Sequence, residues 1–210
     1  MPRRWFIAGV AAAALVGISI GIAFHRQLTG GSAVADAIAL PALHGQATWA
    51  ARERAAPALV LRDQHGRRVT LASLRGRTIA LTFLDSRCKQ ACPIEGRLIG
   101  AAVRQTSGAA RPQLLAVSVN PAGDTPDSVA RAIRKWRLPG DTVWLLGSRA
   151  QLKRVWSAYR ITVDPVSGDI VHSTAVYLID RQGYERAGFV MPFVPAFVAD
   201  DFRALGAERS

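Results

Sequence analysis

The sequence predicts an α/β domain, with a central mixed sheet flanked by helices, that follows one N-terminal transmembrane helix. Three observations lead to this fold class. Runs of β-branched and aromatic residues alternate with segments of helical spacing, which favours strands joined by helices. The last two strand-like runs are separated only by a short turn, which predicts an antiparallel pair. An uncharged apolar stretch, 5–24, precedes all of these segments.

The transmembrane helix is predicted at Trp5–Phe24, because a helix of that length, at about 1.5 Å per residue, spans the roughly 30 Å hydrocarbon core of a bilayer. Arg3 and Arg4 precede it, which favours a cytoplasmic N-terminus and an exported body. The double arginine also resembles a twin-arginine export signal. A cleavable signal peptide is the alternative, since Ala33–Ala35 forms an acceptable cleavage site. We therefore predict an anchor or uncleaved signal at 1–29, with the domain on the periplasmic side of a bacterial inner membrane.

Residues 30–55 are rich in Ala, Gly and small polar residues without clear periodicity, and they are predicted as a linker. The domain is expected over 56–206. Its strands are expected on both sides of a turn at 63–66, and then at 78–85, 113–119, 142–146, 173–180 and 184–190. Its helices are expected at 94–103, from 126 after a cap at Asp124 or Thr125, at 148–159 with Ser148 as cap, and at 195–205.

The formal net charge of +12 comes mainly from arginine and is spread along the chain. No run of five or six basic residues occurs, and basic and aromatic residues are not interleaved as a nucleic-acid surface requires. Nucleic acid is therefore not an expected partner. Attraction to anionic lipid or to an acidic partner stays open, because a basic domain near a membrane is drawn to its surface.

The chain has two cysteines, both in the stretch FLDSRCKQACPIEG at 83–96. Two are too few for a disulfide scaffold or a four-cysteine zinc site. Cys88 follows the first predicted central strand, and Cys92 stands at the start of the next helix. A helix N-terminus and the charges of Arg87 and Lys89 both favour the thiolate form. The pair is thus a redox pair, part of a mixed-ligand metal site, or structurally idle.

Thiolates are soft ligands that select Cu(I) or zinc. Two sulfurs alone can hold Cu(I), and a nearby imidazole would make the site trigonal. His172 directly precedes a predicted core strand and is placed where it could face the cysteines. His25 is expected at the membrane interface, while His44 in the linker and His65 in a turn are expected to be solvated.

Three motifs in one order resemble the Sco/SenC family: C-x-x-x-C-P after the first core strand, SVNPAGDTP after the next, and VHSTAVYLID near the end. Members of this family are membrane-anchored, thioredoxin-like copper proteins that help to load the dinuclear copper centre of cytochrome c oxidase. The resemblance covers about 56–198 and implies a thioredoxin-like fold. It also implies that Cys88, Cys92 and His172 bind copper, as Cu(I) and possibly as Cu(II), and that the two cysteines form a reversible disulfide when metal-free.

The implied function is a metallochaperone that delivers Cu(I) to the dinuclear copper site of cytochrome c oxidase or maintains the thiols of that site. The implied partners are the copper-bearing subunit of the oxidase and a copper donor or thiol reductant. An exported thiol–disulfide oxidoreductase and a copper or redox sensor are the alternatives. The three residues between Cys88 and Cys92, in place of the usual two, favour metal binding. Asp85, three residues before Cys88, disfavours a peroxidase, because a carboxylate there repels the thiolate.

Overall fold

The structure of the chain, a computed structural model, describes residues 43–166 and 169–208. The transmembrane helix predicted at 5–24 and the first part of the predicted linker lie outside the described residues. Within those two ranges, no helix is both long and apolar enough to cross a membrane. The helices and strands of the described part begin at Ala47 and end at Ala207.

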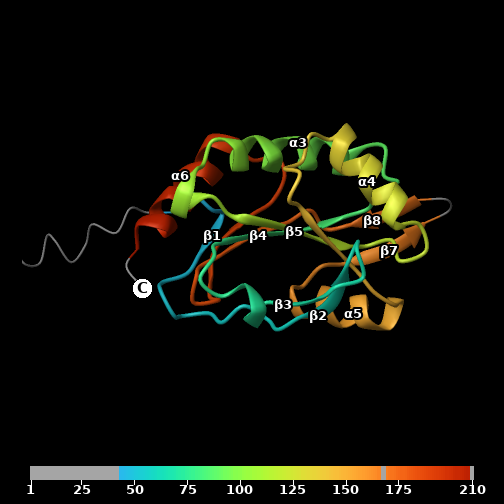
Figure 1. The fold of residues 1–210 in the computed structure, drawn as a ribbon, viewed down its shortest axis with the longest axis horizontal. Helices are drawn as coiled ribbons and strands as arrows, with labels where there is room; N and C mark the ends of the chain where they lie inside the picture. Colours follow the sequence, from blue (N-terminus) through green and yellow to red (C-terminus); the bar gives the residue numbers. More distant parts are fainter. Residues whose placement is uncertain (1–42, 167–168, 209–210) are drawn as a thin grey trace, which may run out of the picture. The chain divides into compact units, whose positions relative to one another are not determined.

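An eight-stranded mixed sheet forms the centre of the domain (Figure 1). Its strands in chain order are β1 (Ala47–Thr48), β2 (Val60–Asp63), β3 (Arg68–Thr70), β4 (Ile79–Leu84), β5 (Gln113–Ser118), β6 (Val143–Leu146), β9 (Val176–Ile179) and β10 (Glu185–Phe189). They lie in the order β1-β10-β9-β4-β5-β6-β2-β3. β4, β5 and β6 are parallel, and the other neighbouring pairs are antiparallel. The prediction of an α/β domain with a mixed sheet is confirmed.

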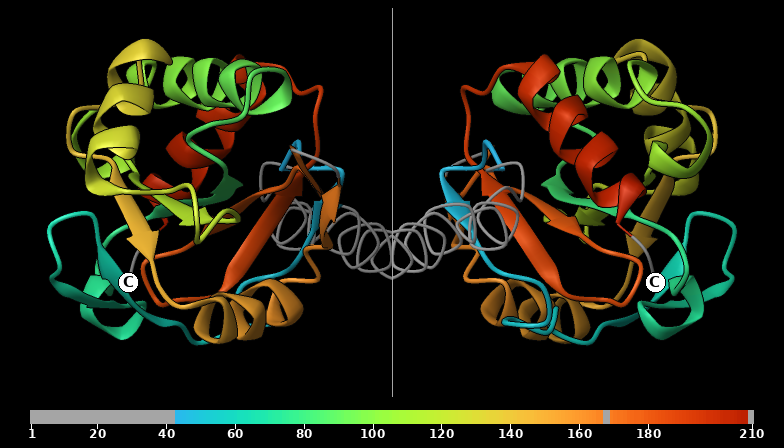
Figure 2. Two further views of the ribbon diagram at one scale, coloured as in Figure 1. Left: turned by 90° about the vertical axis from the view of Figure 1, so that its right-hand side faces the viewer. Right: turned by 90° about the vertical axis from the view of Figure 1, so that its left-hand side faces the viewer.

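The central strand β4 is buried along its whole length, and its side chains alternate between two hydrophobic cores. Ala80 and Leu84 belong to one core, and Leu81 and Phe83 to the other. Three helices contribute to the first core, namely α3 (Ala91–Arg104), α4 (Pro126–Lys135) and α6 (Pro195–Ala207), whereas α5 (Arg149–Ala158) contributes to the second. The views in Figure 2 show the same division, with α5 alone on its side of the sheet among these helices.

The helices begin close to the residues that the local chemistry predicts. Thr125 caps α4 by accepting a hydrogen bond from the amide of Ser128, and Ser148 caps α5 in the same way. α3 begins at Ala91 rather than at 94, so that Cys92 lies on its buried face. Pro93 is compatible with this start, because the first turn of a helix leaves its amides without intrahelical partners.

Residues 43–55, which were predicted as linker, pack against the domain. β1 pairs with β10 at the edge of the sheet. Nδ1 of His44 lies 2.7 Å from Oδ1 of the buried Asp201, and the imidazole stacks on Phe197 at 4.8 Å between ring centroids. The His44 side chain remains 41 % exposed, as the sequence predicted, while these two contacts hold it against α6. This segment shows no periodicity because distant residues, and not a buried face of its own, hold it in place.

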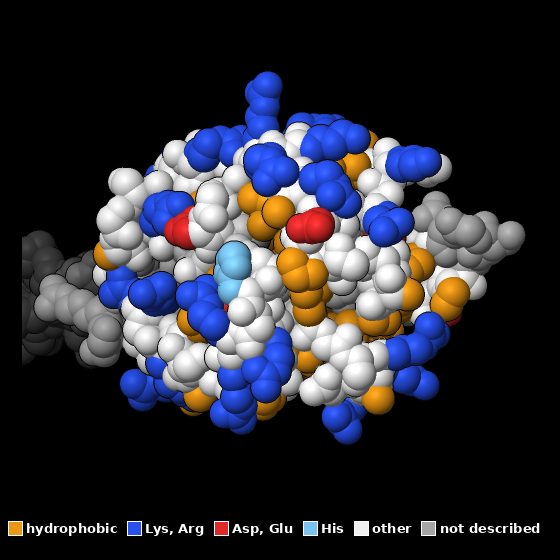
Figure 3. All heavy atoms as spheres, turned by 45° about the vertical axis from the view of Figure 1, so that its right-hand side comes forward, with side chains coloured by type: hydrophobic (Ala, Val, Ile, Leu, Met, Phe, Trp, Pro, Cys, Tyr) orange, Lys and Arg blue, Asp and Glu red, His pale blue; other side chains and the backbone are white. Residues whose placement is uncertain are grey.

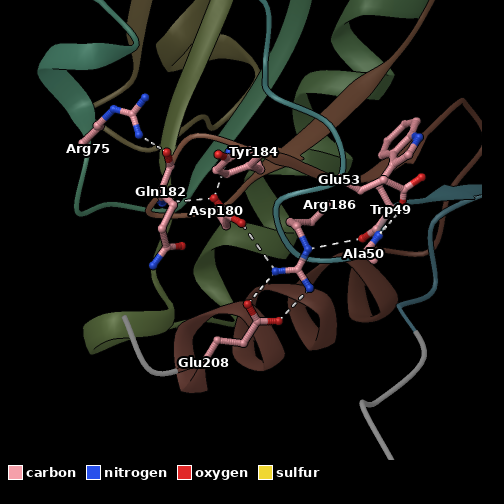
Figure 4. A network of polar contacts seen from close by, with 9 residues as sticks. All are labelled: Trp49, Ala50, Glu53, Arg75, Asp180, Gln182, Tyr184, Arg186 and Glu208. Atoms are coloured by element: carbon pink, nitrogen blue, oxygen red, sulfur yellow. Dashed lines mark hydrogen bonds and ion pairs between the residues drawn. The ribbon is translucent and has the colours of Figure 1, made fainter. Parts of the chain in front are cut away.

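Arg186 of β10 links three parts of the chain (Figure 4). Its guanidinium is 4 % exposed and donates to both carboxylate oxygens of Glu208, at 2.5 and 2.8 Å, just after α6. It also lies 3.5 Å from Asp180 and donates to the carbonyl of Trp49 at 3.3 Å. Because a buried charge needs such partners, this network fixes the C-terminal helix and the 43–55 segment to the sheet.

A separate two-stranded hairpin, β7 (Val163–Val166) and β8 (Asp169–His172), was not predicted. Its strands pair only with each other, and His172 is opposite Val163 in their register. The amide of Ser173 donates to the carbonyl of Thr162 just beyond the hairpin, which continues the pairing. The hairpin therefore places His172 immediately before the run that leads into β9.

Candidate metal centre

The two cysteines lie where the central strand β4 ends and α3 begins. This is the carboxyl end of the parallel strands, where functional groups of open α/β sheets collect. Cys92, the second residue of α3, is completely buried, whereas Cys88 in the preceding loop is half-buried. Only Cys88 is therefore open to a partner molecule.

The hydrogen bonds between the two thiols separate their pKa values. The Cys92 thiol donates to the Cys88 sulfur, and this bond lowers the pKa of Cys88 most. Burial opposes the shift, but the backbone amides of Cys92, Gln90 and Ala91 also donate to the Cys88 sulfur, and its pKa falls to about 5. The amide of Cys92 lies 3.5 Å from the Cys88 sulfur. The same bond to Cys88, together with burial, raises the pKa of Cys92. At neutral pH, Cys88 is a thiolate and Cys92 a thiol.

His172 reaches this pair from the end of β8. Its Nε2 lies 3.3 Å from the sulfur of Cys92, and its Nδ1 lies 2.9 Å from the carbonyl oxygen of Ser173. A carbonyl only accepts, so Nδ1 carries the hydrogen and the Nε2 lone pair points toward the sulfur. The preceding residue, Val171, is 58 % exposed and takes no part in this. A backbone carbonyl orients the imidazole here.

The three residues predicted as ligands are thus brought together, Cys92 touching His172 and Cys88 touching Cys92. Across the described residues, no three His, Cys, Asp or Glu side chains already stand as a complete set of metal ligands. The donor atoms are soft sulfur and imidazole nitrogen, which suit Cu(I) better than a hard cation. His44 and His65 lie elsewhere, at Asp201 and in the exposed β2–β3 turn.

A buried aspartate, Asp124, holds the cysteine loop from the far side. Its Oδ1 accepts a hydrogen bond from the amide of Ser86 at 2.8 Å, and its Oδ2 lies 3.4 Å from the indole nitrogen of Trp144. The hydroxyl of Ser86 lies 2.7 Å from that of Ser128 in α4. These bonds join the residues before Cys88 to the segment that opens α4.

A second aspartate, Asp85, continues the same support. Its Oδ1 accepts from the amide of Arg87 at 2.8 Å and from the side-chain amide of Asn120 at 3.1 Å. The sequence motif around 120–126 therefore positions the cysteine loop. From the sequence alone, this motif indicated only a family resemblance and the start of a helix. Asp85 directly follows β4, and Asp124 lies two residues before α4. These positions were the sequence signal for the role of the two aspartates in holding the loop.

We expect Asp124→Ala to lower the free energy of unfolding by about 1–3 kcal/mol, because it leaves the amide of Ser86 and the indole of Trp144 without their acceptor. Denaturant unfolding of the reduced protein measures this loss. Asp127→Ala is the matched control, since Asp127 is an exposed carboxylate at the start of the same helix, and we expect it to cost less than about 1 kcal/mol. Equal losses of unfolding free energy for the two variants would contradict the proposal that Asp124 holds the cysteine loop.

Glu95 places a carboxyl group in the core beneath the cysteines. It is fully buried on α3, three residues after Cys92, and burial raises its pKa to about 8. At neutral pH it is a neutral acid that can donate its proton to the hydroxyl of Thr82, 2.5 Å away, while that hydroxyl donates to the carbonyl of Ala175. Its other oxygen has no hydrogen-bond partner in the described part of the chain. Sequence reasoning missed this group, although it lies on the same helical face as Cys92 and Ile99.

This chain is similar to known proteins of one family. The model of the SCO1/SenC family matches residues 49–205. The sco1 protein of Schizosaccharomyces pombe is 27 % identical over 136 residues, which are 60 % of this chain and 51 % of that protein. The chain thus spans about half the length of that relative. A protein of Stutzerimonas stutzeri, named for copper binding, is 29 % identical over 150 residues, 67 % of this chain and 72 % of that protein.

Among solved structures, the copper-bound structure of ScoI from Bradyrhizobium japonicum is similar to this chain with a TM-score of 0.62 and 26 % sequence identity. The match covers 71 % of this chain and 98 % of that one. The predicted thioredoxin-like fold of the domain is confirmed by this agreement in architecture.

Proposed function

This chain belongs to the SCO1/SenC family of thioredoxin-like copper chaperones of cytochrome c oxidase assembly, and from this premise we propose that it binds one Cu(I) ion through Cys88, Cys92 and His172 and passes it to the copper-bearing subunit of that oxidase. The observation that supports this proposal most is the contact between Nε2 of His172 and the sulfur of Cys92, 80 positions apart in sequence. An imidazole with its free lone pair beside two cysteines is a donor set of the kind that Cu(I) prefers.

The three residues have different tasks in this proposal. Cys88 is already a thiolate and is half-exposed. Its sulfur would therefore form the first bond to an incoming Cu(I) ion, and that bond would be the last to break on release. Cys92 must release its proton before its sulfur can bind, so loading near neutral pH releases about one proton per ion. His172 is oriented to bind through Nε2, because its Nδ1 is held by the carbonyl of Ser173.

A Cu(I) titration of the reduced chain against a chromophoric chelator tests this function. We expect one equivalent to be taken from the chelator, with release of about one proton near pH 7. If the chelator keeps all the copper, the metal function is wrong and the cysteines act as a dithiol.

One observation favours a second function, exported thiol–disulfide exchange. An accessible thiolate at Cys88 with a buried thiol at Cys92 behind it is the arrangement of an attacking and a resolving cysteine. The same pair would reduce a disulfide at the oxidase copper site to two thiols before loading, and Cys88 and Cys92 would form a disulfide in return. Equilibration of the oxidised chain with dithiols of known potential tests this, and a reduction potential of about −120 mV, which is typical of a strong oxidant, would rule out a reductant role.

We propose further that the domain works on the periplasmic side of a bacterial inner membrane, held there by the N-terminal segment 5–24. The supports are the family and the uncharged run after Arg3 and Arg4. Fractionation of cells that express the chain, followed by protease treatment of intact spheroplasts, checks both the membrane attachment and the side on which the domain lies.

A further inference from the structure

A groove beside Cys88 carries positive charge that copper binding does not use. It has a volume of about 400 Å³ and lies between the cysteine loop and α4. Cys88 lies at it, and four cations line it: Arg87, Lys89, Arg131 and Lys135. No acidic side chain is among its lining residues in the described part of the chain.

The four cations come from two elements. Arg131 and Lys135 are four positions apart on α4 and therefore extend from one face of the helix. Arg87 and Lys89 stand on either side of Cys88, and the guanidinium of Arg87 is held by a hydrogen bond from its Nε to the carbonyl of Gly123 at 2.9 Å. The cysteine loop and the helix thus face each other across the groove with like charges.

Ion pairing within the fold does not account for this cluster. None of the four side chains forms an ion pair within the two described ranges, and all four are exposed. Like charges at this spacing repel one another and destabilise the folded state slightly. In the space-filling view, Lys and Arg side chains gather over the upper part of the face, at the height of α3 and α4 in Figure 1, with few acidic side chains between them (Figure 3).

We propose that this groove docks an acidic segment of the protein with which Cys88 exchanges copper. The inference rests on the proposed function and names the chemistry of its partner. Long, exposed cations spread along two elements suit several carboxylates on a chain segment, whereas a single small anion needs donors that converge on one point. Because Cys88 lies at the groove, a segment held there places its own sulfur or imidazole ligands next to the sulfur that gives up the ion.

The test uses the reduced, metal-free full chain and two peptides. Each peptide carries one cysteine as a disulfide with 2-thiopyridine, flanked by four Glu in one peptide and by four Gln in the other. The Cys88 thiolate attacks the peptide sulfur, the peptide–Cys88 disulfide forms, and the pyridine thiolate leaves and is protonated to the absorbing thione. We expect the Glu peptide to react about tenfold faster at low ionic strength, and the ratio to fall toward one in about 1 M salt.

The double variant Arg131→Glu/Lys135→Glu should abolish or reverse this ratio. Lys153→Glu/Arg154→Glu on α5 is the matched control: it changes the net charge by the same amount on an exposed helix beside the other core, and it should keep the ratio. Equal rates for the two peptides with the parent chain, or equal loss in both variants, would overturn the proposal.

A small-anion site is the other reading that the test separates. If the variant changes the reaction with the dianionic reagent dithiobis(nitrobenzoate) but not the Glu-to-Gln peptide ratio, the groove binds small anions and the proposal of a protein segment is wrong. The assay contains no metal. Equal peptide rates would therefore contradict the docking proposal without affecting the proposed copper function. A failed copper titration would contradict the copper function without affecting the measured peptide rates.

Discussion

Replacing Cys88 or Cys92 with serine is expected to lower the affinity for Cu(I) by more than about 100-fold, beyond the 10- to 100-fold that loss of an outer-shell partner usually costs. A hydroxyl is a hard, protonated donor and cannot replace a thiolate at a soft ion. His172→Ala should weaken binding by less than either cysteine variant, because the two sulfurs remain. Competition with a chromophoric Cu(I) chelator measures all three variants on one scale.

The His172→Ala variant tests the assignment of the third ligand most directly. The hairpin that His172 ends is separate from the main sheet and packs Val163 and Ile170 against the second core, whereas His172 itself belongs to neither core. His172→Ala should therefore leave the fold intact, and thermal unfolding of the metal-free protein checks this. His65→Ala is the control, since His65 is exposed in a turn and should leave the affinity unchanged. If His172→Ala binds Cu(I) as tightly as the parent, His172 is not a ligand.

Features that depend on local chemistry were predictable from the sequence. The caps at Thr125 and Ser148 bond to residues three positions away, and a reader of the sequence sees both partners at once. β4 was predictable because it is buried on both faces and shows an unbroken apolar run. The two cysteines are close in space because they lie four positions apart at a helix start.

Features that depend on distant partners were not predictable. β1 has two residues and no pattern of its own, and it is a strand only because β10 lies beside it. The bond from Asp124 to the amide of Ser86 joins positions 38 apart. The neutral state of Glu95 follows from burial, which the sequence does not display. His172 was placed correctly by its position before β9, whereas the carbonyl that orients it was not anticipated.

Alkylation of Cys88 by iodoacetamide should show a midpoint near pH 5 instead of near the ordinary value of 9.0. The folded chain lowers this pKa, so the thiolate persists down to about pH 5 and is lost only below it. The rate at pH 7 is a poor measure, because the gain in thiolate is nearly cancelled by the lower nucleophilicity of a low-pKa sulfur. At pH 5.5 the two effects no longer cancel, and Cys88 should react roughly 40-fold faster than an ordinary thiol.

The source of the low pKa is tested by two variants. Cys92→Ala removes the thiol donor, the largest cause of the shift, and keeps the backbone amide, so the midpoint should move up by about one unit or more. His172→Ala should not move it, because the imidazole contacts Cys92 and not Cys88. A midpoint near 9 in the parent would mean that Cys88 must also lose a proton to bind Cu(I). Loading near neutral pH would then release about two protons per ion instead of one, and the copper titration itself would show the difference.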